Sequence, residues 1–216
     1  MINPRKTSVR RDEGSARKTS RMGATGYFTH PLCMKHEMGA GHPECPERIS
    51  AIEDRLLVTG LDMALQRREA APAALADLEL AHGRMHVAAL RGLSDVLRDD
   101  QAAGGPSHTA LDSDTSINVH TWDAALVSAG AAIEATDAVI AGELENAFCA
   151  TRPPGHHACR DKAMGFCFFN NVAIAAKHAV ERHGLKRVAI VDFDVHHGNG
   201  TEDIVAGDER ILMVSF

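Results

Sequence analysis

The chain has 216 residues, of which 44% are apolar and 24% are charged. This balance is typical of a globular protein and excludes a disordered chain, a collagen or a coiled coil. A chain of this length buries roughly 70% of the surface that its unfolded form exposes, so it can form one sizeable core. It contains 13 His against seven Phe, one Trp and one Tyr. Imidazole is a frequent metal ligand and titrates near neutrality, so the histidine excess indicates a functional site whose location depends on the positions of the histidines.

Charge is unevenly distributed along the chain. Residues 1–22 carry a net charge of +5, whereas residues 23–216 carry −11. The first stretch is rich in Ser, Thr and Arg and has no hydrophobic periodicity, so we expect a basic, disordered tail. A nucleic-acid-binding arm or a transit peptide is the alternative interpretation of this tail. The acidic remainder argues against nucleic acid as the main partner.

The cysteines and the apolar stretches indicate the compartment. The five Cys residues include no CxxC pair, which predicts neither a zinc ribbon nor a disulfide framework and favours a reducing, cytoplasmic location. The longest weakly charged stretch, 124–141, contains Glu134 and Asp137, so we expect a buried helix there and no membrane partner. No segment has the apolar core of a signal peptide.

From residue 24 onward, strand and helix patterns alternate. In chain order we expect a strand at 24–29, a helix from Pro46 to a stop at Gly60, helices at 75–80 and 86–96, a loop at 104–107, a helix at 122–141, a strand at 146–151, a helix at 171–183, and strands at 187–193 and 210–216. Strands separated by helices of this length predict βαβ units and a mostly parallel sheet. The continuously apolar run 187–193 is typical of a strand buried on both faces.

A cluster of Asp and His follows the strand that ends near Asp192. Ligands of open α/β sheets bind beyond the carboxyl ends of the strands. Strand alternation would point Asp192, Asp194 and His196 the same way, and a cation would relieve the cost of bringing them together. Asp194 and His196 offer donors that suit zinc or iron(II), and Asp192 lies one step deeper. The alternative is a polar loop that caps a helix. Gly198 and Gly200 favour the metal site because glycine permits close backbone approach.

A second cluster follows the strand at 146–151. His156 and His157 stand on a Pro-Pro-Gly turn that fixes the backbone, so one imidazole could act as a general base and the other could stabilise charge or donate a proton. Two surface histidines in a loop are the alternative. His36, His42 and Glu44 could form a further ligand set, or they could be architecture beside a helix start.

Five motifs, in order, resemble those of the histone deacetylase and acetylpolyamine amidohydrolase superfamily. They are HPECPER at 42–48, LDSDT at 111–115, RPPGHHA at 152–158, MGFCFFNN at 164–171 and DFDVHHGNGT at 192–201. The resemblance extends from about residue 24 to the end of the chain. Asn199 and the MGFCFFN run are similar to the class II and bacterial branch.

This resemblance implies an arginase/deacetylase-like α/β fold, in which an open, mostly parallel sheet is flanked by helices. It also implies that Asp194 and His196 bind a catalytic zinc ion. Asp192, the carbonyls of Asp194 and His196, and the Ser215 hydroxyl would hold a structural potassium ion.

The resemblance further implies metal-assisted amide hydrolysis by the histidine pair. Asp192 would orient His156, and Asn199 would lie near His157. Zinc would polarise the acetyl carbonyl, one histidine would take a proton from water, and a protonated histidine would pass a proton to the leaving amine.

The substrate would enter through a narrow channel. By resemblance, Gly165 and Phe166 line this channel, with Phe166 stacking on the alkyl chain, and Asp114 accepts hydrogen bonds at the rim. Acetyl-lysine, an acetylpolyamine or another acylated alkylamine would fit such a site, and the channel residues do not separate them. The sequence does not indicate an oligomeric state.

Two functional residues implied by the resemblance have no counterpart in this sequence. The second zinc-binding Asp and an oxyanion-stabilising Tyr would follow the strand that contains Ser215, and the only Tyr of the chain, Tyr27, lies in the first strand. We therefore expect residues 23–216 to be the amino-terminal part of a deacetylase-like domain. Its sheet would be incomplete on the C-terminal side, and it would be inactive alone because catalytic zinc normally has three protein ligands.

Two other functions are alternatives. The chain could be a non-catalytic module that binds acyl-lysine without hydrolysing it. It could also be an arginase-like hydrolase with two manganese ions, although the single Asp-x-Asp-x-His run argues against a second metal.

Overall fold

The computed structural model describes residues 23–216, so the predicted disordered tail at 1–22 lies outside the described residues. Within this range the strands form two parallel ladders and one antiparallel hairpin. The ladders are β2 (Leu65–Glu69), β1 (Thr25–Thr29) and β5 (Asn146–Cys149) in that order, and β6 (Val188–Asp192) with β7 (Ile211–Ser215); the hairpin is β3 (His108–Ala110) with β4 (Ser116–Asn118).

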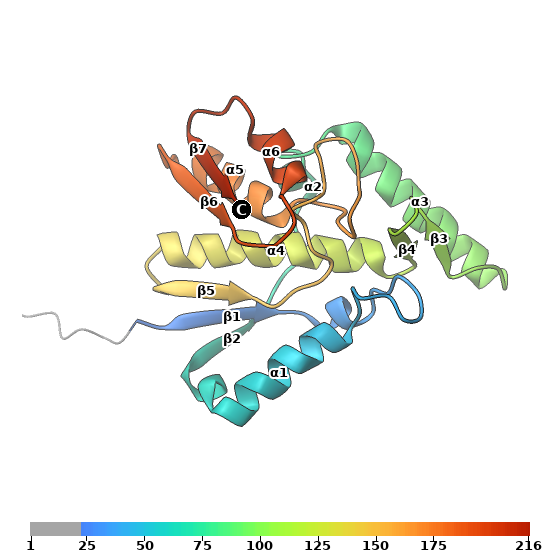
Figure 1. Ribbon diagram of the computed structural model, residues 1–216, viewed down its shortest axis with the longest axis horizontal. Helices are drawn as coiled ribbons and strands as arrows, with labels where there is room; N and C mark the ends of the chain where they lie inside the picture. Colours follow the sequence, from blue (N-terminus) through green and yellow to red (C-terminus); the bar gives the residue numbers. More distant parts are fainter. Residues whose placement is uncertain (1–22) are drawn as a thin grey trace, which may run out of the picture.

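Helices flank both ladders (Figure 1). The α-helices are α1 (Glu47–Thr59), α2 (Leu75–Leu78), α3 (Arg84–Ala102), α4 (Thr121–Ile140), α5 (Asn171–Glu181) and α6 (Asn199–Val205), and two 3₁₀ turns span η1 (Pro31–Met34) and η2 (Leu61–Ala64). The predicted α/β class, with a mostly parallel open sheet, is therefore confirmed.

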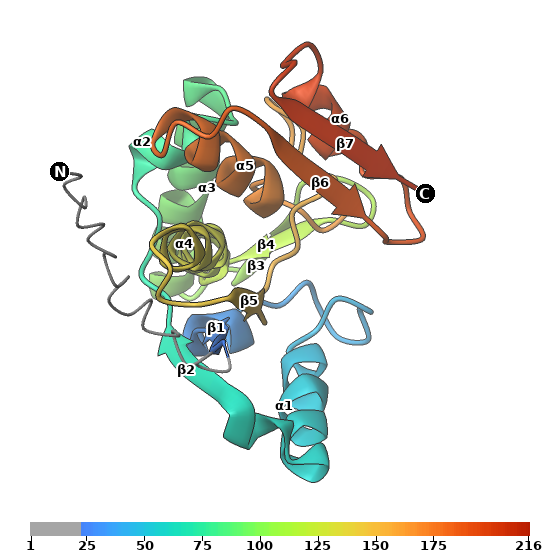
Figure 2. The same ribbon diagram turned by 90° about the vertical axis from the view of Figure 1, so that its left-hand side faces the viewer.

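Helix α4 runs through the middle of the molecule in Figure 1, and Figure 2, which views it end-on, shows it together with α5 on one side of the two ladders. Its Ala-rich surface is buried, as expected for the stretch 124–141. Small side chains let neighbouring segments come close: a Cβ at Gly130 would lie 1.8 Å from the carbonyl oxygen of Ala71. The backbone N–H of Ala73 also donates to the carbonyl of Leu126 across 2.9 Å. This contact ties the segment after β2 to the middle of α4.

The main hydrophobic core lies between α4, α5 and the elements around them. It includes Trp122, Phe168, Phe169, Ile174 and Ile190. Burial of such side chains contributes roughly 1.5–3 kcal/mol each. This core supports the loops that follow β5 and β6, which contain the predicted site residues.

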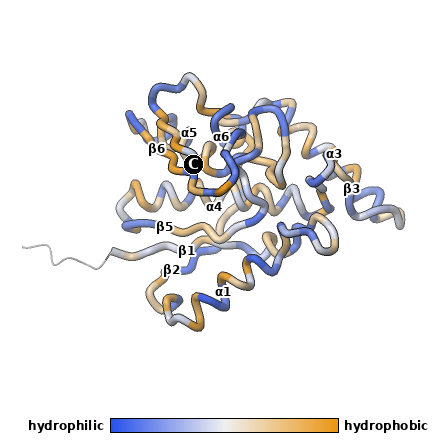
Figure 3. Tube along the Cα trace, viewed as in Figure 1, coloured by the Kyte–Doolittle hydropathy of each residue, from blue (hydrophilic) through white to orange (hydrophobic). Residues whose placement is uncertain are grey.

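The two ladders are not hydrogen-bonded to each other. An apolar groove of about 490 Å³ separates β5 from β6, and helices α4 and α5 form its floor. Figure 3 shows hydrophobic residues in β6 and in the later part of β5, on the two sides of this groove. Phe148 and Val191 on these strands are 50% and 58% exposed.

The prediction that the strand at 187–193 is buried on both faces is wrong for the described residues. Ile190 is buried, whereas Ala189 and Val191 are exposed. The reason is that α5 covers only one face of β6, and β6 pairs along one edge with β7.

Most predicted element boundaries are confirmed. Helix α1 begins after Pro46 and ends at Gly60, whose φ of 72° is the left-handed conformation that favours glycine. Helix α3 is longer than predicted and runs to Ala102 rather than Val96. Strand β2 was not predicted because its sequence, LQRRE, is largely polar, which an edge strand tolerates.

The structure also bears on the cysteines and on membrane insertion. All five cysteines are free thiols in the structure. No helix within residues 23–216 has the length and apolar character needed to cross a membrane.

Candidate active site

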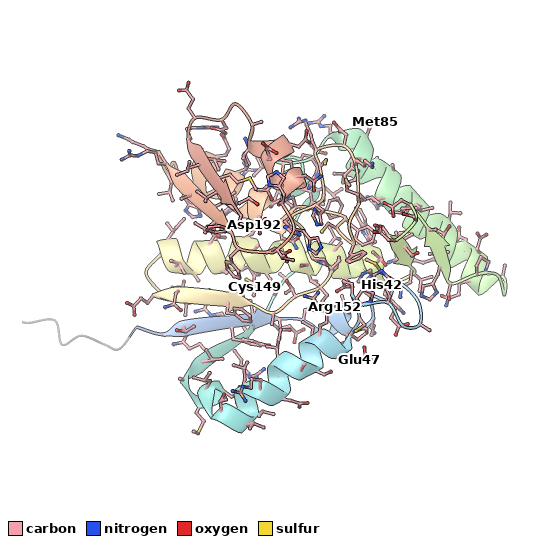
Figure 4. All side chains as sticks on the ribbon, viewed as in Figure 1. His42, Glu47, Met85, Cys149, Arg152 and Asp192 are labelled. Carbon is pink, nitrogen blue, oxygen red and sulfur yellow. The ribbon has the colours of Figure 1, made fainter. Side chains whose placement is uncertain are left out.

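A cavity of about 330 Å³ opens beside the carboxyl ends of β5 and β6. Its walls come from loops that are far apart in the sequence: Pro43, Glu44, Arg48, Asp114, Pro154, His156, His157, Gly165, Phe166, Asp194 and His196. Figure 4 shows Asp192 at the end of β6 and Arg152 after β5, on the side toward which the strand arrows point. The fold thus brings together the residues of the two predicted His motifs with the predicted channel residues.

The two histidines of the pair lie next to each other with different partners. Nδ1 of His156 is 2.9 Å from Oδ2 of Asp192, and Nδ1 of His157 is 2.6 Å from Oδ1 of Asn199. The ring centroids of the pair are 4.0 Å apart. Because a carboxylate only accepts, Nδ1 of His156 carries the proton, and Nε2 is the nitrogen left free to accept one.

The turn that holds the pair is anchored to helices on both sides. The Ser128 hydroxyl of α4 donates to the carbonyl of Pro153 across 3.0 Å, and the Asn171 amide at the start of α5 donates to Ser128 Oγ across 2.9 Å. The backbone N–H of Thr201 in α6 donates to the carbonyl of His156 across 3.0 Å. These contacts fix the backbone on which the imidazoles stand.

The segment after β6 departs from the strand geometry that was predicted. The strand ends at Asp192, and the following residues form bends, so alternation does not orient Asp194 and His196. Instead, backbone N–H groups connect them: Asp194 N donates to Asp192 Oδ1, and His196 N donates to Asp194 Oδ1 across 2.8 Å. Nδ1 of His196 lies 3.0 Å from the same oxygen of Asp194. The side chains of Asp194 and His196 are 49% and 72% exposed.

These contacts also act on the ionisation of Asp194. The N–H of His196 lowers the pKa of the Asp194 carboxyl, and this outweighs the opposing effect of partial burial. Asp194 is therefore anionic at neutral pH.

Two glycines allow the loops to meet at the cavity. A Cβ at Gly165 would lie 2.5 Å from Cδ2 of His157, and a Cβ at Gly198 would lie 2.2 Å from Oδ2 of Asp192. Gly165 also has a φ of 56°, in the region that side chains disfavour. The glycines are thus needed for the approach of the loops to His157 and Asp192.

Phe166 forms one wall of the cavity in an unusual backbone conformation. Its φ is 70°, and its N–H donates to the Thr115 hydroxyl across 3.2 Å. The His42 ring contacts the Phe166 ring edge-on, with the ring centroids 4.6 Å apart. His42 Nε2 lies 3.1 Å from the carbonyl oxygen of Asp114. Sequence reasoning did not identify these roles of Thr115 and His42, although both residues stand within the quoted motifs.

Asp114 lies at the mouth of the cavity on a tight turn. The Asp112 carboxylate accepts hydrogen bonds from the N–H groups of Asp114 and Thr115 at 3.0 and 2.7 Å. The turn leaves the Asp114 side chain exposed beside Phe166 and His42.

Behind this mouth, a buried ion pair joins the first loop to the Pro-Pro-Gly turn. Both side chains, Arg152 and Glu44, are almost fully buried and form a bidentate pair with distances of 2.5 and 2.6 Å. Burial raises the pKa of the Glu44 carboxyl, but the close His36 ring and the hydrogen bonds from Arg152 lower it overall to about 2. Glu44 thus holds the first loop against the Pro-Pro-Gly turn, which favours a structural role for Glu44 over that of a metal ligand.

Ser215 and Asp192 are neighbours across the β6–β7 ladder. The Ser215 hydroxyl accepts a hydrogen bond from the N–H of Gly198 across 3.2 Å. Asp192 and Ser215, two of the predicted potassium ligands, thus lie side by side at the start of the loop that contains Asp194 and His196.

Among the described residues, three metal-ligating side chains come together away from this cavity. They are Asp137, His178 and His183, on α4 and at the end of α5. The predicted zinc pair, Asp194 and His196, has no third His, Cys, Asp or Glu of residues 23–216 in a comparable arrangement.

The fold and the cavity define an α/β protein in which a histidine pair and acidic side chains gather at the carboxyl edge of its parallel strands. The family model of the histone deacetylase domain matches residues 42–216. The chain belongs to the histone deacetylase family.

Individual relatives agree with this placement. The chain is 41% identical over 208 residues to the histone deacetylase-like amidohydrolase of Pseudomonas aeruginosa, covering 88% of this chain and 52% of that protein. It is 40% identical over 181 residues to the human polyamine deacetylase HDAC10, covering 81% of this chain and 26% of the relative. The solved structure of the HDA15 HD domain superposes with a TM-score of 0.80 at 33% identity, covering 89% of this chain and 52% of that one. The chain thus spans about half the length of the Pseudomonas aeruginosa relative and of the solved structure, and about a quarter of the length of human HDAC10.

Proposed function

We propose that the cavity beside β5 and β6 is part of the active site of a zinc-dependent amide hydrolase that removes acetyl groups from acetyl-lysine or similar acylated alkylamines. The observation that carries this proposal is the pairing of His156 with Asp192 and of His157 with Asn199 at a cavity that Asp194, His196 and Phe166 also line. The family supports the reaction class, since its named relatives are deacetylases and amidohydrolases.

The donor chemistry of the cavity fits zinc. Asp194 offers a carboxylate oxygen and His196 an imidazole nitrogen, directed at each other across 3.0 Å. Zinc bound there would polarise the amide carbonyl and lower the pKa of water. Two protein ligands are fewer than the three usual in catalytic sites, so we expect weak metal binding and no robust turnover by the 216-residue chain alone.

The proton chemistry belongs to the histidine pair. Asp192 holds His156 in the tautomer whose Nε2 accepts a proton from water, and it stabilises the resulting imidazolium. His157 is held by the neutral amide oxygen of Asn199, which fixes its ring without adding a negative charge. A protonated histidine of the pair then gives its proton to the leaving amine.

Substrate binding would rest on Phe166, Gly165 and Asp114. The Phe166 ring, held by His42 and Thr115, would pack on the alkyl chain, while Gly165 keeps the channel narrow beside His157. Asp114 at the mouth would accept a hydrogen bond from the backbone or amine of the substrate. A structural potassium ion would be held by Asp192, Ser215 and the carbonyls of Asp194 and His196.

One observation favours an acetylpolyamine as a second candidate substrate. The exposed Asp114 carboxylate lies at the cavity mouth, and residues 23–216 carry a net charge of −11. Such a negative charge attracts a polycation. The named human relative is a polyamine deacetylase, which supports this alternative.

The proposal is tested by measuring zinc content and the turnover of a fluorogenic acetyl-lysine peptide and of monoacetylated spermidine by the 216-residue chain. We expect no robust turnover and measurable binding of one of the two acetylated compounds. Robust zinc-dependent turnover would contradict the expected inactivity, and the absence of binding to both compounds would contradict the assignment of the cavity.

A further inference from the structure

A second group of metal-ligating side chains lies between α4 and α5. Nε2 of His178 and Nε2 of His183 lie 2.6 and 2.5 Å from the same atom, Oδ1 of Asp137. The donor atoms of the three residues all lie within 4.8 Å of one another. None of these residues belongs to the five motifs or lines the candidate active site.

The position of each donor is fixed by backbone structure. Asp137 stands in the last turns of α4 and His178 in α5, two helices that pack through small residues such as Ala176. After α5 the chain reverses at Gly184, where the N–H groups of Gly184 and Leu185 donate to the carbonyls of Val180 and Ala179 across 3.1 Å. This reversal sets His183 beside His178, with ring centroids 5.2 Å apart. The donors are thus arranged without a flexible segment.

The arrangement is convergent in a way that simple ion pairing does not require. A carboxylate has two oxygens, each of which can accept a hydrogen bond. The imidazoles of His178 and His183 nevertheless both point to the same oxygen, Oδ1 of Asp137. The His178 side chain is 10% exposed, and its Nδ1 has no hydrogen-bond partner among the described residues. Among the described residues, the only hydrogen-bond partner of the His178 ring is therefore Oδ1 of Asp137.

The three donors are open to solvent on one side. The Asp137 side chain is 46% exposed and that of His183 is 29% exposed, so an ion can reach them. Two imidazole nitrogens and one carboxylate oxygen are a ligand set typical of zinc and related divalent ions, with water as a fourth ligand.

We propose that Asp137, His178 and His183 form a second metal site, specific for a divalent ion of the zinc class, which fastens the end of α5 to α4. Ligands would replace the present hydrogen bonds by small outward movements of the two imidazoles. The bound ion stabilises the folded chain because the three donors come together only when α4 and α5 are packed. This site is independent of the proposed deacetylase reaction.

The experiment separates the two sites by substitution. The background is the 216-residue chain with Asp194→Asn and His196→Gln, two exposed positions whose replacement removes the proposed catalytic ligands. Zinc binding is measured by titration calorimetry, and the unfolding temperature is measured with and without zinc. We expect about one zinc ion per chain in this background and a zinc-dependent rise in unfolding temperature.

Asp137→Asn and His183→Gln are the test variants, and Asp77→Asn is the matched control. The amide oxygen that Asp137→Asn introduces can still accept from both imidazoles, so the helix contact persists while the anionic ligand is lost. Asp77 faces Arg182 near the same end of α5, and its substitution changes the charge equally. Loss of a residue that only hydrogen-bonds to a metal ligand already lowers metal affinity about 10- to 100-fold. We therefore expect the zinc affinity of each test variant, which lacks a ligand itself, to fall at least about tenfold.

The control should keep the zinc affinity of the background. The proposal is overturned if Asp137→Asn and His183→Gln bind zinc as the control does, or if the background binds none. Because neither outcome involves turnover, failure of this proposal is distinguishable from failure of the proposed deacetylase function.

Discussion

Single glycines determine how closely the segments around the histidine pair approach one another. At Gly200 an added Cβ would lie 2.4–2.5 Å from backbone atoms of Ala158 and His157, which cannot move aside without shifting the pair. We expect Gly200→Ala to lower the free energy of unfolding by about 2 kcal/mol or more. At Gly92 in α3 an added Cβ would meet no atom within 4 Å, so Gly92→Ala should raise it by about 0.5–1 kcal/mol. Urea unfolding of both variants tests this difference in sign.

The buried pair of Arg152 and Glu44 provides a second prediction for single residues. Glu44→Gln leaves the Arg152 charge, which is 1% exposed, without an anionic partner. The expected cost is about 3–5 kcal/mol of unfolding free energy. The exposed pair of Arg68 and Glu143 is the control, since Glu143→Gln should cost at most about 1 kcal/mol. Equal losses in the two variants would show that the buried pair has no special role.

The residues of the cavity were more predictable than their contacts. The pairing of His156 with Asp192 and of His157 with Asn199 was expected from the resemblance of the motifs. The contact between His42 and Phe166 was not, because no pattern within one motif indicates which ring of another motif it will meet. The cluster of Asp137 with the two histidines was missed for the same reason, since Asp137 precedes His178 by 41 residues and His183 by 46.

Elements were predictable where hydrophobic periodicity and end signals agree. Pro46 and Gly60 mark α1, and Gly184 marks the reversal after α5. Strand β2 and the hairpin β3–β4 have no comparable signal, because they are short or lie at an edge. The burial of β6 depends on which layers cover it, and this is a property of tertiary packing that the strand sequence does not contain.

A buried histidine joins the start of α3 to the site loop and makes stability depend on pH. His82 accepts a hydrogen bond from the N–H of Asn170 at Nε2 and contacts the carbonyl of Cys159 at Nδ1. Burial, with a smaller effect of His86, lowers the pKa of His82 to about 4. The unfolded chain therefore takes up a proton below about pH 6.5 that the folded chain does not bind until about pH 4.

Stability should consequently fall as the pH is lowered through this window and be fully present above it. One such histidine contributes a slope of about 1.4 kcal/mol per pH unit. Burial lowers the pKa of His36 and His86 as well, so the slope of the whole chain should be steeper. Urea unfolding at pH 7.5, 6.5 and 5.5 measures the dependence of the unfolding free energy on pH. His82→Gln should make this dependence less steep. A free energy of unfolding that is constant over this range would contradict the burial of neutral histidines.

The molecule as a whole leaves apolar surface exposed at the edges and outer face of its ladders. Val191 on β6 is 58% exposed, and Leu212 on the neighbouring strand β7 is 62% exposed. Such a surface binds apolar dyes and promotes association. We expect the 216-residue chain to enhance the fluorescence of an anilinonaphthalene sulfonate dye. Val191→Lys with Leu212→Lys should reduce this signal more than Val58→Lys with Met63→Lys, which adds equal charge on α1 and η2. Equal reductions would contradict the assignment to the ladders.

The central claim is that the cavity between the histidine pair and Phe166 binds an acylated lysine side chain. The most direct measurement is a ¹⁹F NMR titration of a trifluoroacetyl-lysine peptide with the 216-residue chain in the presence of zinc. Binding should broaden and shift the peptide resonance, and Phe166→Ala should weaken binding about tenfold or more, since burying an aromatic ring is worth more than about 1.4 kcal/mol. Phe148→Ala, at a half-exposed ring on β5, should leave binding unchanged. Equal binding by the two variants, or no binding by the unsubstituted chain, would contradict the claim.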